Sequence, residues 1–356
     1  IESRMPARLA DLIIKKMPDV RWTIIALSVF AGIISAFVDN VATVLMVAPV
    51  AITIAKKLNI SPVPSVIAIA VASNLEGAAT LVGDTTSILL GGHTDMDFLD
   101  FFWMKDRPGM FWVVQLGLVA ATLVLYWIFR KMRQPVDIEK ITDVKDYFPT
   151  FLLLATIVLL ILASFIPNKP NETNGYICLS LMVIGIIYDM ILTGKLSSLK
   201  RIMLQMDYFT LLLLASLFVV IAGIKEAGVI DAIAEFFVQL GGNSVFLMYS
   251  VILWASVLLS AFIDNIPYVA TMLPVVASIL AIMGIEPYLF YFGLLSGATL
   301  GGNLTPIGAS ANIMAIGILR RNGHEVSNQD YMRISVPYTL AAVTTAYIAV
   351  WFLWHV

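Results

Sequence analysis

Four carboxylates lie inside strongly apolar stretches of this chain: Asp39, Glu76, Asp84 and Asp264. No Lys or Arg falls at a comparable depth in those stretches. Burying an ionised carboxylate costs several kcal/mol unless the group is paired, protonated or solvated. Because no basic partner is available, the pattern indicates a bound cation, a bound proton or a water-filled cavity. A simpler interpretation, in which the aspartates only cap helix N-termini, stays open and is strongest for Asp84.

Two of these acids belong to a motif that occurs twice. Ser35–Asn40 returns 225 residues later as Ser260–Asn265, with Ile263 in place of Val38. The same offset pairs Pro49 with Pro274, Gly77 with Gly302, Thr80 with Thr305 and Gly83 with Gly308, whereas Glu76 pairs with Gly301. A repeat with one polar half-site per copy is typical of transporters built from two related halves.

Each motif is followed by a Gly-rich polar segment, at 74–87 and 302–312. Such segments are too polar for a continuous lipid-facing helix, and irregular backbone at membrane depth must be enclosed by protein or water. Unwound carbonyls coordinate cations, while half-helix N-termini favour anions. Close helix packing through small residues is the structural alternative. The candidate ion- or substrate-binding residues are Asp39, Asn40, Thr43, Asn74, Glu76, Gly77, Thr80, Gly83, Asp84, Thr85, Asp264, Asn265, Gly302, Asn303, Thr305, Gly308, Ser310 and Asn312.

Composition places these motifs in a membrane protein. Of the 356 residues, 60% are hydrophobic and 13% charged, and the mean hydropathy is +0.91. Soluble domains carry about a quarter of charged residues. We therefore expect an all-α polytopic protein whose partners are the lipid bilayer and a small ion or anion, with no nucleic acid. No P-loop is present, so this chain is not expected to bind ATP itself, although a separate ATPase subunit could drive it. No cofactor is expected beyond H+ or Na+ as the coupling ion.

The apolar runs predict how the spans are organised. The stretches 23–56 and 245–283 are predicted to be re-entrant hairpins, because arms of about 16 residues span roughly 24 Å against a hydrocarbon thickness of about 30 Å. Two ordinary crossings joined by a tight turn are the alternative. The other predicted elements are an interfacial helix at 1–17, a broken helix at 64–91, a span at 110–129, a linker at 130–148, spans at 149–167, 176–193 and 208–223, an interfacial helix at 226–241, a broken helix at 286–318 and a span at 335–354.

The basic residues predict an orientation. With the hairpins counted as non-crossing, 18 of the 22 Lys and Arg residues share a side with the 130–148 linker. The positive-inside rule makes that side cytoplasmic. By the offset of 225, residues 1–129 form the C-terminal part of repeat 1 and residues 149–356 form repeat 2. We expect that the first spans of repeat 1 are missing from this chain, and that five crossings per repeat make the two repeats inverted.

The motifs resemble a known group. The stretch 37–49, with residues 72–74 and 83–84, is similar to the arsenite-permease/NhaD branch of the ion transporter superfamily, which also contains the pink-eyed-dilution P protein and, more distantly, sodium-dicarboxylate transporters. Residues 302–312 resemble the matching motif of the second repeat. The resemblance spans nearly the whole chain. It departs at Glu76-Gly77, where relatives often have Gly-Gly, and at residues 84–87, where relatives often have Asp-Pro-Pro-Asn.

The resemblance implies inverted repeats, two re-entrant hairpins, two discontinuous helices, a homodimer and elevator-type alternating access. It also implies one Na+ site at Asn40 with the 79–83 backbone and a second at Asn265 with the 304–308 backbone. We therefore expect a secondary active ion transporter of a prokaryotic plasma membrane, driven by protons or sodium, with Na+/H+ antiport as one form.

Three other functions stay open from the sequence. Arsenite or antimonite efflux and sodium-coupled uptake of a carboxylate or other anion are alternatives within transport. An intramembrane aspartyl protease with Asp39 and Asp264 as its dyad is the rival among enzymes. The Gly-x-Gly-Asp context of such proteases is missing, so we expect a transporter rather than an enzyme.

Overall fold

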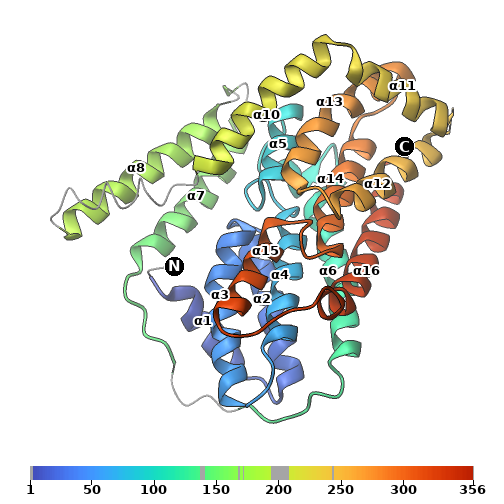
Figure 1. The fold of residues 1–356 in the computed structure, drawn as a ribbon. Coiled ribbons are helices and arrows are strands. Elements are labelled where there is room, and N and C mark those ends of the chain that lie inside the picture. Colours follow the sequence, from blue (N-terminus) through green and yellow to red (C-terminus); the bar gives the residue numbers. More distant parts are fainter. Residues whose placement is uncertain are drawn as a thin grey trace.

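The architecture is nearly all helical in a computed structural model, which describes residues 3–136, 141–166, 169–170, 172–193, 208–242 and 244–355 (Figure 1). The single sheet in those ranges is a hairpin of two short antiparallel strands, β1 (Trp103–Met104) and β2 (Arg107–Pro108). The predicted all-α fold class is confirmed.

The first copy of the repeated motif lies in the helices α1 (Met5–Ile14), α2 (Val20–Ser35), α3 (Asn40–Lys57), α4 (Val63–Gly77), α5 (Thr85–Thr94), η1 (Leu99–Phe101) and α6 (Met110–Ile128). The second copy lies in α11 (Val229–Gly241), α12 (Val245–Ser260), α13 (Asn265–Met283), α14 (Tyr288–Gly301), η2 (Gly302–Leu304), α15 (Ser310–Arg321) and α16 (Asn328–Trp354). Between them are α7 (Phe148–Ser164), α8 (Thr173–Thr193) and α10 (Tyr208–Glu226), which extend to one side of the remaining helices (Figure 1).

The helix boundaries repeat at the same offset of 225 residues as the sequence. The helices α2, α3, α4 and α5 begin at residues 20, 40, 63 and 85, and α12, α13, α14 and α15 begin at 245, 265, 288 and 310. Contacts repeat as well, since α1 packs on α2 and α3 while α11 packs on α12 and α13. The inverted orientation of the two copies in a membrane stays a prediction.

Side-chain caps explain why the hairpin helices start where they do. The Asp39 carboxylate accepts a hydrogen bond of 3.0 Å from the Ala42 amide, and that of Asp264 accepts one of 3.2 Å from the Ile266 amide. An aspartate in this position satisfies an N–H group that has no partner within the helix and interacts favourably with the helix dipole. Both copies therefore start their third helix with the same device.

The two copies interlock through their short helices. The helix α5 packs on α13 and α14, and α15 packs on α3 and α4. Every residue of 65–77 in α4 and of 289–301 in α14 is buried. A helix that is enclosed on all sides forms the centre of a large core. Each copy thus contributes one central helix and one short helix that docks on the other copy.

Five described helices are long and apolar enough to cross a bilayer: Asn40–Lys57, Met110–Ile128, Thr173–Leu192, Asn265–Met283 and Asn328–Trp354. A sixth span is possible if the pair Leu211–Glu226 and Val229–Gln239, bent by 72°, counts as one. The α3 arm has 18 residues rather than about 16, which corresponds to about 27 Å. The choice between a re-entrant hairpin and two crossings stays a prediction.

Part of the predicted charge asymmetry lies outside the described residues. Those positions are Lys140 in the 130–148 linker and Lys195, Lys200 and Arg201 before α10. The cytoplasmic side of the linker therefore stays a prediction.

Candidate ion-binding site

Backbone carbonyls converge on one glycine in each break. A Cβ atom added to Gly83 would lie 2.7 Å from the Gly77 oxygen, 2.9 Å from the Ser35 oxygen and 3.0 Å from the Ala36 oxygen. Only glycine allows the backbone of the break to approach the end of α2 this closely. We call these three carbonyls the first carbonyl cradle.

The second copy has the same arrangement around Gly308. A Cβ atom there would lie 2.5 Å from the Gly302 oxygen, 2.7 Å from the Ser260 oxygen and 2.8 Å from the Ala261 oxygen. These are the residues at an offset of 225 from the first set, and we call them the second carbonyl cradle. Three convergent carbonyl oxygens offer lone pairs of the kind that hard cations take.

A threonine fixes one carbonyl of each cradle. The Thr80 hydroxyl donates to the Ala36 oxygen, and the Thr305 hydroxyl donates to the Ala261 oxygen. A second polar side chain fixes the glycine that ends each central helix. The Ser87 hydroxyl donates to the Gly77 oxygen at 3.3 Å, and the amide of its counterpart Asn312 donates to the Gly302 oxygen at 3.0 Å. Both breaks are thus held by matching bonds.

A chain of buried amides joins the two copies. The Asn40 amide donates to the Asn74 oxygen at 2.9 Å. The Asn74 amide donates to the Thr299 carbonyl at 2.9 Å and to the Asn303 side-chain oxygen at 3.2 Å. The Asn303 amide in turn donates to the Val71 carbonyl at 2.9 Å. These residues come from α3, α4, α14 and η2, so the centre of the protein is polar although α4 and α14 are apolar overall.

Asp84 is the most enclosed aspartate of the site, with 3% of its surface exposed. Its carboxylate accepts hydrogen bonds from the Thr85 amide at 2.7 Å, the Thr86 hydroxyl at 3.0 Å and the Asn265 amide at 3.0 Å. Asp39 and Asp264 are close enough to act on it electrostatically. The site therefore concentrates negative charge near the start of α5.

The other two aspartates are less enclosed than the sequence led us to expect. Asp264 is half-buried and accepts a second bond, of 2.8 Å, from the Ser310 hydroxyl. Asp39 is exposed on the surface of this chain, so the protein does not enclose this carboxylate. Asp39, Asp84 and Asp264 all serve as N-caps, which is the simpler interpretation that the sequence had left open.

The start of α15 differs from the other three helix starts at the site. Ala309 precedes α15 at the position that corresponds to Asp84, and no side chain caps this helix. The unsatisfied N–H groups and the dipole of a helix start favour an anion. Of the helices α3, α5, α13 and α15, α15 alone is not preceded by a capping aspartate, although the Asp264 carboxylate accepts a hydrogen bond from Ser310, its first residue.

Three of the predicted residues stand apart from these contacts. Thr43 is buried and its hydroxyl reaches only the Val38 carbonyl, at 3.5 Å. Thr85 is half-buried and contributes its backbone amide to Asp84. Glu76 is fully buried and bonds to Gln115 on α6 at 2.6 Å, away from the amide chain.

The sequence analysis missed several contributing residues. Thr86 and Thr299 share a hydrogen bond of 3.0 Å between the two copies, and Ser87 holds the first break. The offset of 225 could have found two of them, because Thr299 is the counterpart of Asn74 and Ser87 is that of Asn312. Gln115 could have been noticed as the lone amide in the apolar span 110–129.

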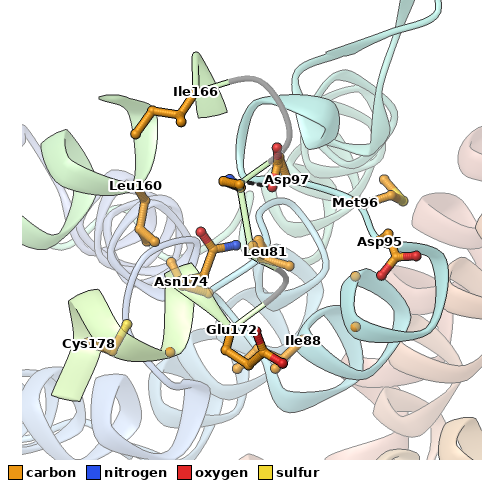
Figure 2. A pocket seen from close by; sticks show the side chains of 15 residues that line it. Leu81, Ile88, Asp95, Met96, Asp97, Leu160, Ile166, Glu172, Asn174 and Cys178 are labelled. Carbon is orange, nitrogen blue, oxygen red and sulfur yellow. Dashed lines mark ion pairs between the residues drawn. The ribbon is translucent and has the colours of Figure 1, made fainter. Parts of the chain in front are cut away.

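No group of three or more His, Cys, Asp or Glu side chains among the described residues is arranged to hold a metal ion. The candidate cation ligands are therefore the cradle carbonyls and nearby amides rather than a carboxylate cluster. A cavity of about 680 Å³ lies beside the first break and is bounded by α5, α7 and α8 (Figure 2). Leu81 and Val82 of the break line it, together with apolar side chains such as Leu160 and Ile166, so it is a largely apolar space next to the polar centre.

Comparisons with known proteins agree with this architecture. A family model described as citrate transporter (CitMHS) matches residues 1–295. An uncharacterized transporter of Mycobacterium tuberculosis is 32% identical over 342 residues, which cover 93% of this chain and 77% of that protein. The human P protein is 25% identical over 90% of this chain and 47% of its own length. The crystal structure of the Alcanivorax borkumensis YdaH transporter, described as having an unusual topology, matches with a TM-score of 0.64 and 15% identity over 99% of this chain and 82% of that one, which shows the shared fold.

Proposed function

The chain belongs to the citrate transporter family CitMHS, a membrane transporter family of the ion transporter superfamily, and we propose that it couples the passage of a small ion across the plasma membrane to a gradient of Na+ or H+. It is an integral membrane protein and a secondary transporter rather than an enzyme. The coupling ion, the cargo and the mode of movement belong to the proposal and are argued below.

The paired carbonyl cradles carry the proposal. Each brings three backbone carbonyl oxygens close together around one glycine, and the two cradles use corresponding residues of the two copies. Carbonyl oxygens hold no exchangeable proton, whereas they replace the water shell of an alkali cation well. This favours sodium over a proton as the ion at the cradles.

The charge distribution supports a cation at the same place. Asp84 lies within electrostatic reach of two other carboxylates. The ion pairs found among the described residues involve neither Asp84 nor Glu76 nor Asp264. In a low-dielectric interior, unbalanced negative charge attracts a mobile cation.

The cross-copy bonds favour movement of the central helices as one body. The bond of Asn265 to Asp84 and that of Asn74 to Asn303 would each leave buried polar groups without partners if the copies separated in every cycle. Sliding of α4, α5, α13, α14, η2 and α15 together against α7, α8 and α10 leaves those bonds intact. Elevator-type alternating access of inverted repeats in a homodimer is the form of transport that meets this condition.

A carboxylate anion is the cargo that one specific observation favours. The start of α15 has no side-chain cap and offers backbone N–H groups and a positive dipole end, while the Ser310 hydroxyl donates to the Asp264 carboxylate. The family description, citrate transporter, names a compound of that class. Sodium at the cradles would balance the charge of the anion, as sodium-coupled uptake of a carboxylate requires.

Purified protein in liposomes tests the proposal directly. An inward Na+ gradient should drive uptake of labelled citrate, and an inward gradient of K+ should not. Parallel assays with other carboxylates, with arsenite and with an internal pH dye distinguish carboxylate uptake, arsenite efflux and Na+/H+ antiport. Transport of every tested solute at the same rate with and without Na+ and H+ gradients would refute coupled transport.

A further inference from the structure

Glu76 occupies a closed slot outside the two carbonyl cradles. Its side chain is 0% exposed, its Oε2 atom accepts a hydrogen bond of 2.6 Å from the Gln115 amide, and its Oε1 atom has no partner among the described residues. Leaving a charged oxygen buried and unpaired is among the most costly arrangements in a protein. The slot therefore requires an explanation that the cradles do not supply.

A comparison of the two copies shows that this slot is not needed for packing. In the first copy, a Cβ atom on Gly32 of α2 would lie 2.9 Å from the Cγ atom of Glu76, so the glycine makes room for the acid. In the second copy the sizes are exchanged: Gly301 takes the place of Glu76 and Val257 takes the place of Gly32. A Cβ atom on Gly301 would lie 2.5 Å from the Val257 Cα atom. The fold thus closes the same helix contact without any acid.

A second unpartnered group lies near the carboxyl. Tyr338 on α16 is 0% exposed, its hydroxyl has no partner among the described residues, and it lies within electrostatic reach of Glu76. The helices packed on α4 are α2, α3, α6, α14, α15 and α16, and Tyr338 is the titratable group on them that interacts with Glu76. The charged residues of those helices form no ion pair with it; they are Arg21, Lys56, Lys57, Arg320, Arg321, Asp330 and Arg333.

These groups fit a proton better than a metal ion. Sodium needs several oxygen ligands, whereas the slot offers one unpartnered carboxyl oxygen and one hydroxyl. A proton on Oε1 removes the charge that makes burial of this group costly. Gln115 stays as donor to Oε2. The Tyr338 hydroxyl lies within electrostatic reach of the carboxyl but is not hydrogen-bonded to it. In the reverse step the carboxylic acid releases H+ and becomes the carboxylate, with no other bond changed.

We infer that Glu76, Gln115 and Tyr338 form a proton-binding site, separate from the carbonyl cradles, that takes up and releases one H+ in each transport cycle. The binding of the proton stands on the geometry of the slot, while its place in the cycle rests on the proposed function. The copy that holds Glu76 would then carry the proton, and the second copy would carry none at the corresponding position.

Infrared difference spectroscopy of the purified protein tests proton binding without any cargo. The wild-type protein should show the carbonyl stretch of a protonated buried carboxyl, which should disappear as the pH is raised. Glu76→Gln should lack this band, and Glu286→Gln should keep it, because Glu286 is an exposed acid paired with Lys105. A wild-type spectrum without such a band at any pH, or a band that survives in Glu76→Gln, would overturn the inference.

A double variant guards against misfolding of the single one. Gly32→Val with Glu76→Gly copies the packing of the second repeat, so it should fold, and it should also lack the band. In liposomes, Glu76→Gln should lose the citrate-dependent movement of H+, and Glu286→Gln should keep it. Absence of Na+-driven citrate uptake by the wild-type protein would refute the proposed function. The infrared result would still decide whether Glu76 binds a proton.

Discussion

The amide of Asn265 donates a hydrogen bond of 3.0 Å to the carboxylate of Asp84, which ties the start of α13 to the start of α5 in the other copy. The corresponding asparagine, Asn40, bonds instead to Asn74 within its own copy. The bond is thus one-sided, because Ala309 stands where a second aspartate would be required. The two halves of the protein share a frame but differ at their centre.

Removal of the Asn265 amide should weaken both folding and transport. We expect Asn265→Ala to lower the free energy of unfolding by about 1–3 kcal/mol, because Asp84 stays buried with one donor fewer. Thermal unfolding in detergent measures this loss. Asn322→Ala is the matched control, since Asn322 is exposed at the end of α15. Equal unfolding midpoints for the two variants would contradict the assigned role of Asn265.

Substitution by alanine should destabilise the protein at the two cradle glycines, and should not do so at glycines elsewhere in the same segments. We expect Gly83→Ala and Gly308→Ala each to destabilise by about 1–3 kcal/mol, because a methyl group would meet backbone carbonyls at 2.7 and 2.5 Å. Gly92→Ala and Gly317→Ala, with open space at the Cβ position, should be neutral or should stabilise by up to about 1 kcal/mol.

The transport assay adds a second criterion for the cradles. Na+-driven uptake should be lost in both cradle variants and kept in both controls. Full Na+-driven uptake by Gly83→Ala and Gly308→Ala would show that sodium binds elsewhere.

The cradle threonines should behave as an equivalent pair. Replacing the hydroxyl by a methyl group, in Thr80→Val and Thr305→Val, removes one hydrogen bond to a cradle carbonyl and should cost about 1 kcal/mol in each case. The stabilisation of the protein by added Na+ should also shrink in both, since ligand binding raises the unfolding midpoint in proportion to affinity. Thr53→Val is the control, because Thr53 is exposed and bonds within its own helix. A normal Na+ effect in both variants would speak against these carbonyls as ligands.

The open start of α15 gives a test of the cargo class. Ala309→Asp should supply the missing cap, as Asp84 does for α5, and should weaken citrate binding by about tenfold or more, which corresponds to about 1.4 kcal/mol. Ala309→Asn supplies a neutral cap of the same shape and should weaken it less. Citrate-induced shifts of the unfolding midpoint compare the two variants. Identical shifts would exclude an anion at this helix start.

The repeat at an offset of 225 residues predicted many of the site residues, because corresponding residues have the same neighbours in both copies. The Asp-Asn motifs and Gly-rich breaks were recognisable from polar residues at unlikely depth, and their glycines proved to be the places where backbones touch. The resemblance to the ion transporter superfamily followed from the same motifs. The interfacial position of 226–241 stays a prediction, and the structure bends α11 by 72° from α10.

Properties that depend on the partner element could not be predicted. Burial of a carboxylate is decided by what covers it, and nothing near Asp39 in the sequence indicates that it reaches the surface. The exchange of sizes between Gly32–Glu76 and Val257–Gly301 involves residues 44 positions apart, which come together only when α2 packs on α4. The bond between Thr86 and Thr299 joins the two copies. The spacing of polar and apolar residues along the sequence does not indicate such a contact between distant residues.

The docking of α5 on α13 and of α15 on α3 has a consequence for biogenesis. The helix α5 leaves the ribosome well over a hundred residues before α13, whose surface covers the polar groups at its start. The polar groups of the first copy must therefore stay within the insertion machinery or the lipid, without their protein partners, until α13 and α15 have been synthesised. Truncations after the linker should be recognised as unfinished and degraded, even when every one of their helices has formed.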